Sequence, residues 1–132
     1  MKTRLATDTD YAFAVEWWQA HNHPQVPRDL LPKCGVVVED GGRPVAMGWL
    51  NLDNSVGVGM LNFIVTNPLN SPAKFSVQAI KTLAEAARQV AAELGYGVLI
   101  VTASETLAGL LRRQGFAHIS DQPHYHVFKR TR

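Results

Sequence analysis

The feature that most constrains the fold is a long amphipathic segment that leads directly into an apolar one. Between residues 72 and 94 apolar side chains recur at helical spacing, and the charged side chains fall on the opposite side. Ser71 is placed as an N-cap with Pro72 at the first helical position, and Gly95 is placed to end the helix. The continuously apolar run Gly97–Thr102 is typical of a buried strand, so the segment predicts a right-handed helical crossover onto a sheet.

Extended runs precede this helix. Residues 36–39, 44–52 and 58–66 are rich in apolar and β-branched side chains and are separated by turn-forming residues. The third run stops at Asn67-Pro68, and Pro72 follows closely; prolines cannot continue a ladder of backbone hydrogen bonds. These runs predict three antiparallel strands in succession.

The two ends of the chain complete the element order. A first helix is predicted from Asp8 to Ala20, with Thr7 and Asp10 in a capping box. A short helix over 105–114 precedes Gly115-Phe116, and the runs 117–120 and 125–128 predict a terminal hairpin. With no internal repeat or linker, residues 1–132 are predicted to form a single domain of the α/β (α+β) class.

Composition excludes several classes of protein. The chain is 46% hydrophobic and 18% charged, which is typical of globular domains. No apolar run approaches the roughly 20 residues of a membrane span, and the N-terminus lacks the apolar stretch of a signal peptide. The single cysteine, Cys34, excludes an internal disulfide framework. A cytoplasmic protein without a membrane partner is therefore expected.

Taken together, the element order and two local motifs resemble the GCN5-related N-acetyltransferases (GNAT). The resemblance covers nearly the whole chain, from Lys2 to Lys129. It depends on Ile64-Val65-Thr66-Asn67-Pro68 at a strand end, on the long helix after it, and on Ser104 to Gly115-Phe116. It implies a mixed, mainly antiparallel sheet in which a central parallel pair of strands splays apart, flanked by helices.

The resemblance also implies that acetyl-coenzyme A (acetyl-CoA) binds in that splay as the cosubstrate, with no metal. Backbone groups of Ile64, Val65 and Thr66 would pair with the pantetheine arm. The pyrophosphate would lie at the start of the long helix, where backbone N–H groups favour an anion. The residues at this position are Ser71, Ala73, Lys74, Phe75 and Ser76.

The chain departs from the family pattern at the phosphate loop. The family has spaced glycines there, which let backbone N–H groups approach phosphate oxygens closely. The matching positions here are Ser71, Lys74 and Ser76, and Pro72 lacks an N–H altogether. Lys74 is then expected to substitute as a point charge.

The chain also departs from the family pattern at the positions where the family has its catalytic residues. Asn62 stands where the family often has an acidic residue, and an amide cannot accept a proton from an ammonium. In the short-helix motif, Leu111 replaces the tyrosine that protonates the leaving thiolate, and Ser104 replaces an asparagine. Candidate bases are therefore histidines: His21 and His23 after the first helix, and His124 and His126 in the terminal hairpin, where Tyr125 is a candidate acid.

Three functions stay open at this point. The leading one is transfer of an acetyl group from acetyl-CoA to an amine, on a small molecule or a protein. A second is a catalytically degenerate binding or regulatory module. A third is a nucleic-acid-modifying protein, because the fold resembles that of the phage Mom protein and the last 21 residues hold five basic residues against one acidic residue; the net charge of +2 argues against it. The C-terminal strand offers an edge for homodimer formation.

Overall fold

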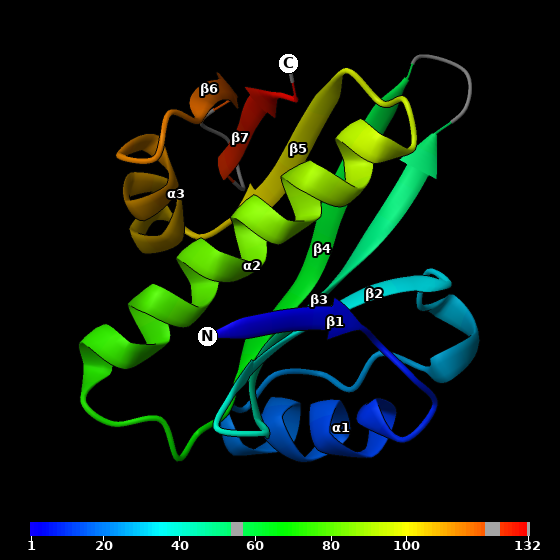
Figure 1. Cartoon of the computed structure of the whole chain (residues 1–132). Coiled ribbons are helices and arrows are strands. Elements are labelled where there is room, and N and C mark those ends of the chain that lie inside the picture. The colour runs from blue at the N-terminus through cyan, green and yellow to red at the C-terminus, as the bar shows by residue number, and fades with distance from the viewer. Residues whose placement is uncertain (54–56, 121–124, 132) are drawn as a thin grey trace.

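A single seven-stranded sheet with helices on both faces forms the fold in the computed structural model, which describes residues 1–53, 57–120 and 125–131 (Figure 1). The strands are β1 (Lys2–Leu5), β2 (Cys34–Asp40), β3 (Arg43–Asp53), β4 (Val58–Thr66), β5 (Val98–Ala103), β6 (Ala117–Ser120) and β7 (Tyr125–Arg130). The helices are α1 (Asp10–Ala20), α2 (Ala73–Glu93), α3 (Glu105–Arg112) and a short 3-10 helix, η1 (Arg28–Leu30). Across the sheet the order is β1-β2-β3-β4-β5-β7-β6, and β4 and β5 run parallel among otherwise antiparallel neighbours. The expected fold class is confirmed.

The starts of two helices differ from expectation. α1 begins at Asp10 rather than Asp8. One half of the capping box forms: the Thr7 N–H donates a hydrogen bond to the Asp10 carboxylate at 2.7 Å. α2 begins at Ala73, one residue late. Pro72 has ψ 176° and is therefore the extended N-cap residue, so the placement of Ser71 as N-cap was wrong.

The helices end in turns with a left-handed residue. At the end of α2 Gly95 has φ +87°, and the Tyr96 N–H donates back to the Ala91 carbonyl, as the sequence predicted. Asn22 takes the same place after α1 with φ +58°, and the His23 N–H donates to the Trp18 carbonyl. α3 stops at Arg112, two residues before the expected Gln114, but the chain keeps turning until Gly115, whose φ is +93°. Similar end geometry therefore fixes the direction in which each chain segment leaves its helix.

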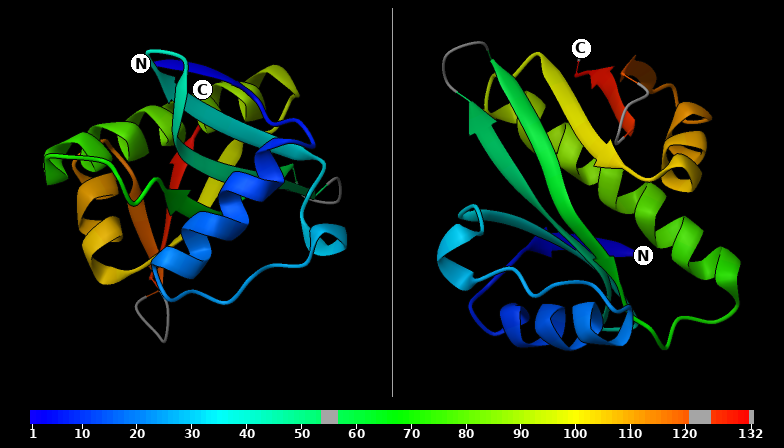
Figure 2. Two further views of the ribbon diagram at one scale, coloured as in Figure 1. Left: turned by 90° about the horizontal axis from the view of Figure 1, so that it is seen from below. Right: turned by 180° about the vertical axis from the view of Figure 1, so that it is seen from behind.

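The sheet has a hydrophobic cluster on each face. α2 covers one face, with buried side chains at Ala79, Leu83, Ala84, Ala86, Ala87 and Ala91 against strand residues such as Leu61 and Leu99. α1 packs on the other face, where Trp17 and Trp18 lie against Met47 and Trp49. Trp17 is 3% exposed, so it belongs to the core. The two helices lie on opposite sides of the sheet in Figure 2.

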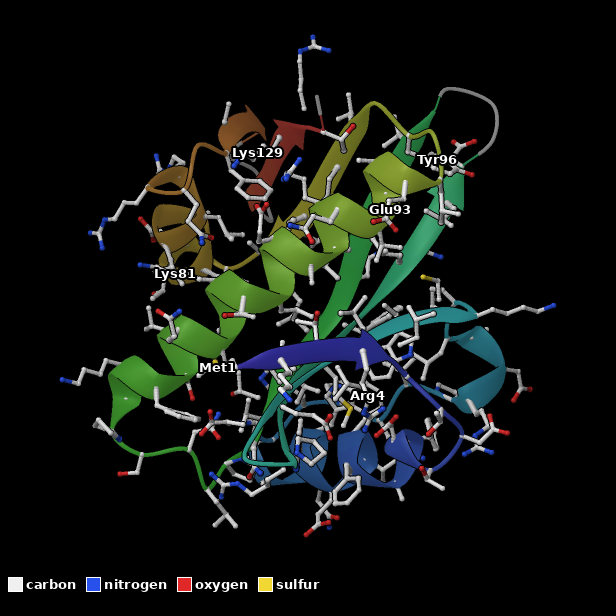
Figure 3. The ribbon with its side chains drawn as sticks, in the orientation of Figure 1. Met1, Arg4, Lys81, Glu93, Tyr96 and Lys129 are labelled. Carbon is white, nitrogen blue, oxygen red and sulfur yellow. The ribbon has the colours of Figure 1, made fainter. Side chains whose placement is uncertain are left out.

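Arg4 of β1 forms an ion pair with Asp10 of α1. Its guanidinium donates two hydrogen bonds of 2.7 and 2.8 Å to the Asp10 carboxylate, and it extends from β1 toward α1 (Figure 3). Asp10 is 2% exposed, and Glu39 of the neighbouring strand lies 3.3 Å from the Arg4 Nε. The Arg4 guanidinium holds the pKa of the Asp10 carboxyl below its usual value, and the Thr7 N–H lowers it further against the effect of burial.

Candidate functional site

Strands β4 and β5 separate part-way along their length. Their parallel pairing runs from Val58↔Val98 to Leu61↔Val101, yet β4 continues to Thr66 and β5 to Ala103. Beyond Leu61, β4 is paired only with β3, and the right-hand view of Figure 2 shows the two strands diverging. The side of β4 that faces β5 therefore presents backbone donors and acceptors over residues 62–66 that the sheet does not use.

A β-bulge changes the direction of β4 at the start of the splay, the region where β4 and β5 separate. The β3–β4 register shifts between Met47 and Trp49, so that Phe63 and Ile64 lie opposite Gly48. Phe63 adopts φ +60°, which a bulky side chain rarely takes, and it is 39% exposed. Gly48 accommodates the crowding here, since a Cβ atom at that residue would lie 2.9 Å from Leu61.

Beyond the bulge, the backbone of Thr66 points into the splay. Asn67 N–H donates to the Val45 carbonyl of β3, and alternate residues of a strand direct their backbone groups to opposite sides. Consistently, the Thr66 carbonyl lies 2.9 Å from the Nε2 atom of His21, which follows α1. The structure thus places His21 at the far end of β4, while β3 leaves the Thr66 N–H free to pair across the splay.

Asn62 lies where the parallel pairing ends, on the α1 side of the sheet. Its side-chain Nδ2 donates to Asn51 Oδ1 at 2.8 Å, and its cross-strand partner on β3 is Trp49. This bond fixes the amide and leaves the Asn62 Oδ1 able to accept a hydrogen bond. Neither amide can act as a base, so this part of the site can orient an N–H group or a water but cannot take its proton.

The predicted phosphate residues lie around the start of α2. Ser71, Ala73 and Lys74 are exposed, and Lys74 has no ion-pair partner among the described residues. Phe75 is half-buried and packs against the α2-side core. The Ser76 hydroxyl accepts a hydrogen bond of 3.0 Å from the Asn70 amide. The first N–H groups of α2 have no partner within the helix, so Ala73 and Lys74 are left to supply backbone donors.

The short-helix motif has structural roles in this chain. Ser104 is the N-cap of α3, and its hydroxyl accepts from the Leu107 N–H at 3.3 Å. Leu111 is completely buried in the α2-side core. The backbone of Tyr125 pairs with Ala103 at the end of β5, next to the splay, whereas His124 lies outside the described residues. The catalytic roles of Asn62, Ser104, His124 and Tyr125 stay predictions.

Other titratable groups lie away from this site. Burial raises the pKa of the Cys34 thiol, which packs against the α2-side core. Among the side chains that the structure describes, no group of three or more His, Cys, Asp or Glu is arranged to hold a metal ion. No described helix is long and apolar enough to cross a membrane.

Comparison with known proteins decides the fold. A probable acetyltransferase from Staphylococcus epidermidis superposes with a TM-score of 0.78 at 14% identity, over 99% of each chain. A ribosomal-protein-alanine N-acetyltransferase from Brucella melitensis gives 0.63 at 17% identity, over 97% of each chain. The chain has the GNAT fold.

A larger enzyme contains the same fold. N-acetylglutamate synthase from Neisseria gonorrhoeae, solved with coenzyme A and L-arginine, matches with a TM-score of 0.74 at 12% identity. The match covers 98% of this chain, which spans about a third (32%) of the length of that enzyme. No protein-family model and no curated protein sequence matches, so the GNAT fold is recognised here through structure.

Two features near the candidate site were missed by the sequence analysis. One is the contact of His21 with Thr66, which are 45 residues apart and carry no shared local signal. The other is a hollow of about 360 Å³ beside Trp49, lined by Tyr11, Arg28 and Lys33 among others. Its lining comes from segments far apart in the sequence, which share no local pattern.

Proposed function

We propose that this chain is an N-acyltransferase that uses acetyl-CoA as its acyl donor and an amine as its acceptor. The observation that carries the proposal is the early end of β4–β5 pairing at Leu61↔Val101, which leaves the side of β4 that faces β5 without a strand partner over residues 62–66. An extended arm with alternating amide donors and acceptors can complete that edge as a strand would. The same fold in a coenzyme A complex of N-acetylglutamate synthase supports this assignment.

The residues of the site offer more hydrogen-bonding groups to the pantetheine arm of the cosubstrate than to its phosphates. Thr66 offers backbone groups to the pantetheine amides, and its carbonyl can accept a second hydrogen bond besides that of His21, because an oxygen has two lone pairs. At the phosphate end Pro72 has no N–H and the Ser76 hydroxyl already accepts from Asn70. Lys74 and the free N–H groups of α2 would therefore hold the phosphates.

The chemistry supplied by acetyl-CoA is an activated acetyl thioester. The main contribution of the chain would be to position the two reactants. The bulge at Phe63 redirects the β4 backbone, and Asn62 Oδ1 accepts a hydrogen bond from the N–H of the acceptor. The amine must be neutral to attack, and Asn62 cannot remove its proton. Solvent water is left to take that proton unless His124 or another histidine does, and Tyr125 is the candidate for protonating the leaving thiolate.

A binding module without catalysis is the second candidate. It is favoured by the burial of Leu111 and the capping role of Ser104, two positions where the family places chemistry. Such a protein would hold acyl-CoA in the splay and release it unchanged. Transfer to any amine would exclude it.

The first experiment is calorimetric titration with acetyl-CoA and, separately, with pantetheine. We expect micromolar binding of acetyl-CoA, and a Lys74→Gln variant should bind it about tenfold more weakly while binding pantetheine unchanged. Lys81→Gln, a partly exposed residue further along α2, is the matched control. No binding of acetyl-CoA at millimolar concentration would contradict the proposal.

Acyl transfer is then measured as thiol release with a panel of amines over a range of pH. If water takes the proton, kcat/KM should keep rising with pH toward the pKa of the amine. A plateau above pH 7 would instead indicate a histidine base.

A further inference from the structure

The hollow beside Trp49 is a second candidate binding site on the α1 side of the sheet. It has a volume of about 360 Å³, within the usual range of small-molecule sites, and is formed by the β1–α1 connection, α1, η1 and β3. Tyr11, Leu31 and Trp49 supply apolar surface, and Arg28 and Lys33 supply positive charge. A larger hollow of about 410 Å³ lies beside Met1 and Lys81 (Figure 3), and residues of α2 form most of its lining.

Arg28 is held in place by neutral partners. Its guanidinium carbon lies 4.8 Å from the centre of the Tyr11 ring, and its Nη2 donates to the Asp8 backbone carbonyl at 2.8 Å. Tyr11 is fixed in turn, because its hydroxyl donates to the Val26 carbonyl at 2.8 Å and accepts from Gln25. The guanidinium is thus positioned before any ligand arrives, which reduces the entropy that binding would cost.

The charge of Arg28 is not neutralised by a neighbouring carboxylate. Among the described residues, Arg4 and Arg88 form salt bridges, whereas Arg28 and Lys33 have no carboxylate within 4.0 Å. The Asp8 side chain also lines the hollow, so the lining carries a net charge of +1. This balance suits a singly charged anion better than a phosphate dianion.

Trp49 adds a donor at the inner wall. The residue is 5% exposed, and its indole nitrogen is not one of the fully buried polar atoms without a hydrogen-bond partner. Gly35 makes room for it, because a Cβ atom there would lie 2.6 Å from the indole nitrogen. The indole N–H can donate to a ligand in the hollow that accepts a hydrogen bond.

The position of the hollow connects it to the proposed reaction. Trp49 is the cross-strand partner of Asn62, which lies where β4 and β5 begin to separate. A ligand bound in the hollow would have to extend past Trp49, by the width of one strand, to reach Asn62.

We infer that the hollow binds the carboxylate of the acceptor, and that the acceptor is a small carboxylate-bearing amine with an apolar body. Arg28 and Lys33 bind the carboxylate, Tyr11 and Trp49 pack against the body, and the amine extends toward Asn62. This inference rests on the proposed function for the identity of the ligand as an acceptor. The carboxylate site itself can be tested without acetyl-CoA.

The binding test uses phenylacetate, with phenylacetamide as its uncharged analogue. In proton–nitrogen correlation spectra the Trp49 indole signal, assigned with a Trp49→Phe variant, should shift with phenylacetate and stay in place with phenylacetamide. Arg28→Gln and Lys33→Gln should each weaken phenylacetate binding about tenfold, while Arg43→Gln, an exposed residue at the start of β3, should not change it. Lys33 is exposed and forms no salt bridge with the described residues, so its variant tests the site even if Arg28→Gln unfolds.

Two outcomes would overturn the inference. Equal binding of phenylacetate and phenylacetamide would show that charge is not recognised, and tighter binding of inorganic phosphate would show that the site selects another anion. In the transfer assay 4-(aminomethyl)benzoate should exceed its carboxamide by about tenfold in kcat/KM, and a ratio near one would overturn the acceptor role. Failure of acetyl-CoA binding with selective phenylacetate binding would remove the proposed function and leave the carboxylate site standing.

Discussion

At the scale of single residues, one buried carboxylate ties the first strand to the first helix. Asp10 accepts two hydrogen bonds from Arg4 and one from the Thr7 N–H, with 2% of its surface exposed. A buried charge that loses its partner is costly, whereas a partly exposed one can turn to solvent. Arg4 is partly exposed and also contacts Glu39, so it is not left as a buried unpaired charge when Asp10 is removed. The loss of stability then comes mainly from the lost interaction between Arg4 and Asp10.

Asp10→Asn should therefore lower the free energy of unfolding by about 2 kcal/mol at neutral pH. The folded-state pKa of Asp10 is lowered, so the stability due to its charge is complete above the unfolded pKa of about 3.9 and is lost as pH falls through the folded value. Urea unfolding should show a constant difference between variant and parent from pH 7 to about 5, and a shrinking one below about pH 4. Asp40→Asn, at the exposed end of β2, is the control, and a difference that persists unchanged at pH 2 would contradict this account.

Gly35 is a second residue whose identity is set by close contact. An added Cβ would lie 2.6 Å from the Trp49 indole nitrogen and 2.7 Å from the Ala6 Cβ, and a backbone-anchored neighbour cannot move away cheaply. Gly35→Ala should lower the free energy of unfolding by about 2 kcal/mol in chemical denaturation. Gly97→Ala meets nothing within 4 Å and should change stability by less than about 1 kcal/mol. Equal effects of the two substitutions would show that the contact is not the cause.

At the scale of elements, the start of α3 separates a structural role from a catalytic one. Ser104 caps the helix through its hydroxyl, so Ser104→Ala should lower the free energy of unfolding by about 1 kcal/mol. Ser104→Asp keeps a capping oxygen and should restore most of that stability. If Ser104 acts only as a cap, kcat below the unfolding temperature should stay within about twofold of the parent for both variants. A loss of kcat of a hundredfold in Ser104→Ala, with a normal melting temperature, would make it a catalytic residue instead.

The elements that sequence predicted well are those whose signal is local. The amphipathic period of α2 and the glycine after it are properties of neighbouring residues, and Gly95 ends the helix as expected. The start of α2 was misplaced by one residue, because Ser71 and Pro72 both suit a helix start and only the backbone angle of Pro72 decides between them. Even so, the same pattern that predicts a strand over 58–66 contains no sign of the bulge at Phe63.

The site is less predictable because it depends on register between distant segments. Nothing in residues 58–66 or 98–103 shows that pairing stops at Leu61↔Val101. The contact of His21 with Thr66 needs both the left-handed turn at Asn22 and the path of β4. Ser104, a position aligned by family resemblance, is the N-cap of α3, and its catalytic role stays a prediction.

At the scale of the whole molecule, the splay is a discontinuity within one sheet. The strands β1 to β4 form an antiparallel unit, and β5 joins it through four parallel pairs before pairing with β7. α2 spans the gap, since it packs against β2, β3, β4 and β5. A ligand that bridges the open edge of β4 would thus complete the sheet without any change in the order of its strands.

Hydrogen exchange can detect that completion one amide at a time. Val65 pairs with Met47 of β3, whereas the backbone of Thr66 points away from β3 into the splay. Saturating acetyl-CoA should slow exchange of the Thr66 amide at least tenfold and leave the Val65 amide within about twofold, because only the first gains a partner. Adenosine 3′,5′-bisphosphate, which lacks the pantetheine arm, should slow exchange at Lys74 and leave Thr66 unchanged. Equal protection of Val65 and Thr66 by acetyl-CoA would indicate general stabilisation by a ligand bound elsewhere, and the assignment of the splay as the cosubstrate site would then be wrong.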